Sequence, residues 1–140
     1  MMREILFRGK RVDNGEWVEG FYSRVSNNWE QKNVHFITCF KDLDNGETVL
    51  TRQELVIPAT IGQYTGVTDK TGKKIFEGDI VKGLFLFGKE VRSQVVFKDG
   101  AFGLEWVRGN AIEFNAFTSL CNIEFEVVGN IYEKNQSEEE

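Results

Sequence analysis

The chain has 140 residues, of which 41% are hydrophobic, and it carries a formal net charge of -5. This composition excludes a disordered chain, and the excess of 22 acidic over 17 basic residues does not favour a dedicated nucleic-acid-binding protein. The sequence contains no apolar run of the ~20 residues that a membrane helix needs and no signal-peptide pattern at its start. We therefore expect a cytoplasmic protein that has no membrane partner.

The first predicted element is a β-hairpin formed by residues 5–12 and 17–22. The sequence DNGE between them is a strong hairpin signal, because Asn and Gly tolerate the positive φ of a type I′ turn. DNGE returns at residues 44–47, which we interpret as independent use of a good turn rather than as a duplicated unit.

A strand with mixed faces is predicted over residues 34–40. Alternation places Val34, Phe36, Thr38 and Phe40 on one face and His35, Ile37 and Cys39 on the other. A short strand over 55–57 follows the second turn, and Pro58 ends it because proline cannot donate a ladder hydrogen bond.

Short strands continue through the rest of the chain. Glycine-rich turns at 69–73 and 77–79 separate predicted strands at 61–64, 74–76 and 80–87. Two more strands and a final one are expected at 91–97, 101–107 and 123–132. Between them, Ile112, Ala116 and Leu120 recur at four-residue spacing, which predicts one or two helical turns over 111–120.

Many short strands joined by tight turns indicate an all-β, mainly antiparallel fold with little helix. We predict a small SH3-like barrel over residues 60–132, an additional N-terminal β-layer over 1–59 and a disordered acidic tail over 133–140. No Pro/Ser-rich linker separates the layer from the barrel, so one continuous domain over 1–132 is the alternative.

The candidate chemistry is sparse, and we predict no catalytic residue, metal site or cofactor. His35 is the single histidine, and it lies roughly 13 Å along a strand from Cys39, too far for two ligands of one zinc ion. We expect His35 to be a hydrogen-bonded strand residue and Cys39 and Cys121 to be small buried hydrophobes. In the turn at 77–79, Gly78 should have positive φ and Asp79 should cap backbone N–H groups.

The motif region and the last strand together carry a family resemblance. The chain resembles the YopX-like proteins of phages and prophages over nearly its full length, through ILFRGKR at 5–11, IGQYTG at 61–66, IFEGDIV at 75–81 and GNIY at 129–132. The resemblance implies a mostly β fold and a phage or prophage origin in bacteria, and it supplies no catalytic residue. The structural motif residues are Gly62, Tyr64, Gly66, Gly72, Glu77, Gly78 and Asp79.

Our leading hypothesis is a phage or prophage accessory protein of the bacterial cytoplasm that acts by binding and is not an enzyme. We expect a homo-oligomer, because the run Leu84–Phe87 sends apolar side chains to both faces of one strand. A different protein partner is left open, and Trp29, in a polar loop, is the best exposed aromatic. The alternative is a nucleic-acid-associated β-barrel module. Its candidate contacts are Arg8, Lys10, Arg11, Lys70, Lys73 and Lys74.

Overall fold

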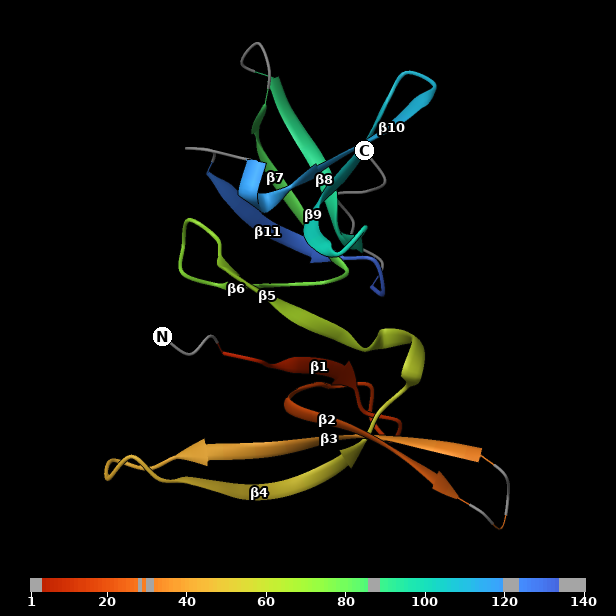
Figure 1. The fold of residues 1–140 in the computed structure, drawn as a ribbon, viewed down its shortest axis with the longest axis vertical. Coiled ribbons are helices and arrows are strands. Elements are labelled where there is room, and N and C mark those ends of the chain that lie inside the picture. Colours follow the sequence, from red (N-terminus) through yellow and green to blue (C-terminus); the bar gives the residue numbers. More distant parts are fainter. Residues whose placement is uncertain (1–3, 28, 30–31, 86–88, 120–123, 134–140) are drawn as a thin grey trace. The chain divides into compact units, whose positions relative to one another are not determined.

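The computed structural model describes residues 4–27, 29, 32–85, 89–119 and 124–133. In this part of the chain the regular elements are antiparallel β-strands and two short 3₁₀ helices, η1 (Pro58–Thr60) and η2 (Phe117–Ser119) (Figure 1). The predicted all-β class is confirmed. None of the helices in the described ranges could cross a membrane.

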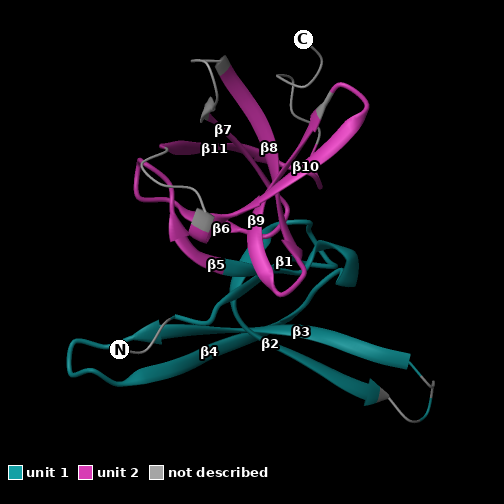
Figure 2. Ribbon diagram, turned by 45° about the horizontal axis from the view of Figure 1, so that its top comes forward, with its two compact units in different colours: residues 1–64 teal, residues 65–140 magenta. Residues whose placement is uncertain are grey.

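The chain divides into two compact units, residues 1–64 and 65–140 (Figure 2). Strand β5 (Gly62–Thr68) runs through the boundary between them. The domain bounds expected from the sequence, 1–59 and 60–132, stay a prediction.

Unit 1 is a sheet whose strands follow the order β4-β3-β2-β1-β5. These strands are β1 (Phe7–Lys10), β2 (Trp17–Asn27), β3 (Lys32–Asp42) and β4 (Thr48–Leu55), followed by the first residues of β5. The predicted hairpin is present, with Phe7 opposite Gly20 in β1 and β2. An isolated bridge between Arg11 and Val56 also ties the end of β1 to the end of β4.

One face of this sheet forms the core of unit 1. Val18, Ile37 and Val56 are buried there, and Phe7 and Tyr22 pack against them. Ile37 comes from the centre of β3 and is fully buried. The face of β3 that carries Ile37 is therefore the core face, and Phe36 and its alternate neighbours point the other way.

The prediction of a type I′ turn at the first DNGE sequence is wrong. Gly15 has a φ of 73°, but Asn14 does not adopt a positive φ. Oδ1 of Asn14 instead accepts a hydrogen bond from the Glu16 amide at 2.9 Å. This local bond is typical of a loop longer than two residues. Both central residues of a two-residue turn have positive φ at Asp99 (53°) and Gly100 (83°), which is the type I′ pattern.

Unit 2 contains a five-stranded antiparallel sheet of order β10-β9-β8-β7-β11, with the short strand β6 (Lys74–Phe76) next to β5. Its strands are β7 (Asp79–Phe85), β8 (Lys89–Lys98), β9 (Ala101–Arg108), β10 (Ala111–Ala116) and β11 (Phe125–Asn130). The core cluster is Ile75, Val81, Val95, Leu104 and Phe125. The pairings describe an open sheet, so closure into an SH3-like barrel stays a prediction.

The helical turns predicted over 111–120 are replaced by a strand over most of that range. Residues 111–116 form β10, which pairs with β9 from Ala111–Arg108 to Ala116–Gly103. Pairing with β9 satisfies the backbone hydrogen bonds of this segment. The stabilisation from this pairing is larger than the weak helical preference that the four-residue spacing indicates. The helical part is the single turn of η2.

Candidate functional site

The first group of predicted nucleic-acid contacts lies around Trp17. Arg8 and Lys10 lie on the Trp17 face of β1, and their cationic groups are 4.6 Å and 5.6 Å from the centroid of its ring. Arg8 is 8% exposed. The two cations are thus held in cation–π contacts within unit 1, with the guanidinium of Arg8 shielded from solvent.

The remaining predicted basic contacts do not join them. Arg11 makes ion pairs with Asp13 at 2.7 Å and with Glu54 at 3.0 Å, so two carboxylates already share its charge. The three lysines belong to unit 2. Lys70 and Lys73 are exposed in the turn at 69–73, and Lys74 is half-buried at the start of β6.

The residue that organises the motif region is Asp69, a role that sequence reasoning missed. Its Oδ1 accepts bonds from the Thr71 amide and hydroxyl at 2.9 and 2.7 Å and from the Lys73 amide at 2.9 Å. Its Oδ2 accepts from the Val127 amide of β11 at 3.0 Å, and the Lys70 amide donates to the Phe125 carbonyl at 2.8 Å. One carboxylate therefore shapes the turn and ties it to β11.

These bonds keep Asp69 ionised. Burial of the carboxyl raises its pKa, but the hydrogen bonds from Val127, Thr71 and Lys73 outweigh burial and hold the pKa of Asp69 at about 2, below its ordinary value of 3.8. A general acid at neutral pH needs a raised pKa, so this environment gives Asp69 a structural role.

The Glu-Gly-Asp turn has the predicted structure. Gly78 has a φ of 93°, and Asp79, which is 1% exposed, accepts a hydrogen bond from the Phe76 amide at 2.8 Å. Glu77, the remaining residue of the turn, is half-buried. Both the Gly78 and the Asp79 predictions are confirmed.

The other motif residues also build backbone structure. Gly66 and Gly72 have φ values of 89° and 91°. Gly62 pairs with Arg8 of β1, and the amide of the buried Tyr64 donates to the Leu6 carbonyl at 2.8 Å. The motif is therefore a fold signature in the described structure.

His35 is engaged as expected. Its Nδ1 lies 2.7 Å from the Tyr22 hydroxyl, and the two rings stack with centroids 5.8 Å apart. Cys39 is half-buried against the core of unit 1, whereas Cys121 lies outside the described residues. Within the described ranges, no three His, Cys, Asp or Glu side chains are grouped so that they could hold a metal ion.

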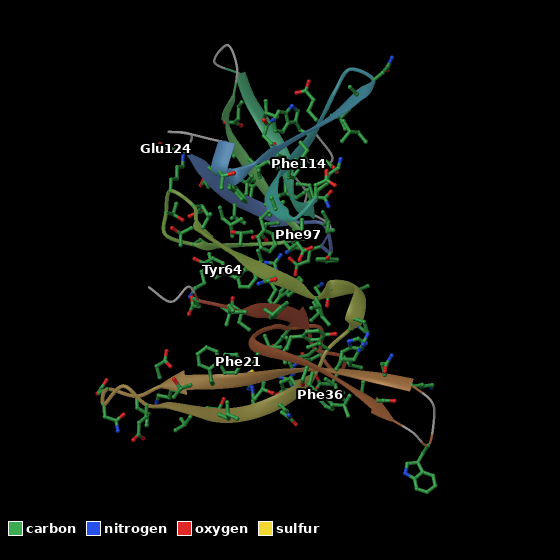
Figure 3. All side chains as sticks on the ribbon, viewed as in Figure 1. Phe21, Phe36, Tyr64, Phe97, Phe114 and Glu124 are labelled. Atoms are coloured by element: carbon green, nitrogen blue, oxygen red, sulfur yellow. The ribbon has the colours of Figure 1, made fainter. Side chains whose placement is uncertain are left out.

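Unit 2 has an open pocket of about 310 Å³ near η2 and β11. One wall is the pair Phe117 and Phe125, whose rings meet edge to face at 6.3 Å. Asp69 in the lining is anchored as described above, and Glu124 is an exposed residue just before β11 (Figure 3). Glu126 lies two residues on and pairs with Lys82 at 3.7 Å.

The most distinctive surface lies on unit 1, and we call it the apolar face. It is the side of β2, β3 and β4 opposite the core, and it bears aromatic and aliphatic side chains on all three strands together with the polar Ser23, Thr38 and Gln53. Its apolar members are Phe21, Val25, Val34, Phe36, Phe40, Leu50 and Leu55. Cross-strand pairing joins them, because Val25 lies opposite Val34, Phe36 opposite Leu55 and Phe40 opposite Leu50.

Four of the seven apolar side chains on this face are exposed, and Val34, Phe36 and Phe40 are half-buried. Leu50 is 65% exposed, Val25 52%, Leu55 46% and Phe21 44%. The rings of Phe21 and Phe40 stack at 4.6 Å and so form a continuous aromatic surface across β2 and β3, near the labelled Phe21 and Phe36 in Figure 3. Contiguous exposed apolar patches of this kind usually mark interaction sites.

Part of the apolar face could be predicted from the sequence. Alternation had already grouped Val34, Phe36 and Phe40, but the assignment of the opposite face to the core came from the structure. The oligomer prediction was based on the run Leu84–Phe87; residues 86–88 and the side chains of Leu84 and Phe85 lie outside the described part of the structure. Trp29 is 96% exposed, as expected.

The fold and the site define a two-unit all-β protein whose Gly/Asp motif organises turns. The family model described as YopX protein matches residues 6–136, so the chain belongs to the YopX family. A crystal structure of protein EF1440 from Enterococcus faecalis is similar, with a TM-score of 0.55 and 20% sequence identity over 93% of this chain and 94% of that one. This likeness concerns the fold alone. No curated protein sequence matches the chain.

Proposed function

We propose that this chain is a phage or prophage accessory protein that acts in the bacterial cytoplasm by binding a protein through the apolar face, and not by catalysis. The observation that carries the proposal is the apolar face itself. A sheet face that exposes Leu50 and Phe21 to water costs hydration free energy unless a partner covers it. Membership of the YopX family supports the phage or prophage origin.

The nucleic-acid alternative has less support. Phosphate binding needs accessible cations, because affinity comes from the replacement of counterions. Arg8 is buried beside Trp17, and Arg11 is paired with Asp13 and Glu54. Binding through these residues would require their existing contacts to be broken first.

Site-specific photo-crosslinking in bacterial cells tests the proposal. A benzophenone amino acid placed at Leu50 should yield discrete protein adducts, because this side chain lies in the apolar face. The matched control is Val107, which is 73% exposed and lies on β9 of unit 2. Adducts that are absent at Leu50, or equal at Leu50 and Val107, would count against binding through this face.

A further inference from the structure

We infer that the partner of the apolar face is a second copy of this chain, which packs its own apolar face on the first across a two-fold axis. The inference rests on the proposed function and names the partner.

The face has opposite charges at its two ends. Strand β3 sends Lys32, Phe36 and Asp42 to the same side, since their positions differ by even numbers in a regular strand. Lys32 and Asp42 are both exposed, and they lie roughly 33 Å apart along β3 at ~3.3 Å per residue. The exposed Glu19 lies at the Asp42 end on the same side of β2 as Phe21, where its cross-strand neighbour is the buried Arg8 of β1.

This arrangement is complementary to itself when one copy is reversed. In a two-fold stack with antiparallel β3 strands, Lys32 of each copy lies opposite Asp42 of the other, and Val34 of each lies opposite Phe40 of the other. The neutral centre brings no like charges together. Two chains of formal charge -5 repel each other overall, and the paired Lys32 and Asp42 across this face offset part of that repulsion.

The size of the face indicates the class of interface to expect. Three strands at ~4.8 Å spacing and seven residues of β3 at ~3.3 Å rise give a flat area of about 300 Å² per copy. The total of about 600 Å² is below that of a standard stable interface. We therefore expect a weak dimer that dissociates on dilution.

Sedimentation velocity of the purified full chain at 1–300 μM and physiological salt tests the apolar contact. Leu50→Lys should weaken dimerisation at least 10-fold, because it places a charge within the apolar face, beside Phe40. Val107→Lys adds the same charge at a side chain of comparable exposure on unit 2 and should leave the dimer unchanged. Far-UV circular dichroism identifies any variant that fails to fold, and Leu55→Lys then replaces Leu50→Lys.

A charge swap tests the orientation. Lys32→Glu and Asp42→Lys should each weaken the dimer about 10-fold, because each creates two like-charged contacts per dimer. The double variant restores opposite charges and should return to within about 3-fold of the unchanged protein.

The inference falls if the unchanged protein is monomeric at 300 μM, if Val107→Lys disrupts the dimer as strongly as Leu50→Lys, or if the double charge swap is no better than the single changes. A monomer that still gives discrete Leu50 adducts in cells would overturn the second copy as the partner while the proposed function stands. Loss of both would overturn both.

Discussion

Replacing Asp69 by Asn should destabilise unit 2 in a way that depends on pH. The substitution keeps the size of the side chain and removes its charge. The amide oxygen of the new side chain could still accept the bonds from Thr71 and Lys73, but its NH₂ group would then face the Val127 amide, donor against donor. The carboxylate is the group that can accept from both sides at once.

The magnitude follows from the pKa of Asp69. The pKa falls from 3.8 to about 2, and each unit corresponds to about 1.4 kcal/mol of preference for the charged form in the folded state. We expect a loss of about 2 kcal/mol in the free energy of unfolding at pH 7, after allowance for solvent screening. Because the folded pKa is depressed, this stability is present above about pH 4 and is lost as the pH falls through about 2.

Urea unfolding at pH 7, 5 and 3 measures the effect. Trp106 packs against the core of unit 2, so its fluorescence follows this unit when Trp17 and Trp29 are replaced by Phe in every protein compared. Asp69→Asn should be about 2 kcal/mol less stable at pH 7 and 5, and the difference should shrink to about half at pH 3.

The control is Asp99→Asn in the same unit. Asp99 is exposed, and Asn tolerates its positive φ, so this variant should show no such pH dependence. A destabilisation by Asp69→Asn that is absent at pH 7, or equal at pH 7 and pH 3, would refute the role of the ionised carboxylate.

Two further predictions concern glycines. Gly78→Ala should cost more than Gly72→Ala, which we expect to cost about 1 kcal/mol. Both residues have positive φ, but an added Cβ at Gly78 would lie 2.8 Å from Cε2 of Tyr132 while Gly72 faces open space; equal shifts of the urea midpoint would contradict this. Gly20→Ala should unfold unit 1, because its Cβ would collide with the Thr38 carbonyl of β3; a circular dichroism melt that matches the unchanged protein would rule out this close approach.

Local chemistry made much of the fold predictable. Positive φ at Gly78 and the cap from Asp79 depend on residues within one turn, and both were expected from the sequence. The first hairpin follows from two β-prone runs around a turn sequence. The type of this turn could not be predicted, because the Asn14 side chain makes its hydrogen bond to the Glu16 amide without a positive φ at Asn14.

The candidate site depended more on contacts that are distant in sequence. Asp69 gains its role from the amide of Val127, 58 residues away, and no local pattern predicts that pairing. The strand at 111–116 likewise depends on β9, whose ladder competes with weak helical spacing.

The sequence by itself determined the β-strand periodicity, the turns and the two alternating faces of β3. Only the tertiary structure decided which face became the core. The bridge between Arg11 and Val56 and the burial of Ile37 assign one side to the interior of unit 1 and leave Phe36 and its neighbours on the apolar face. The physical reason is that alternation separates side chains into two sets, whereas burial depends on which other elements of the chain pack against each set.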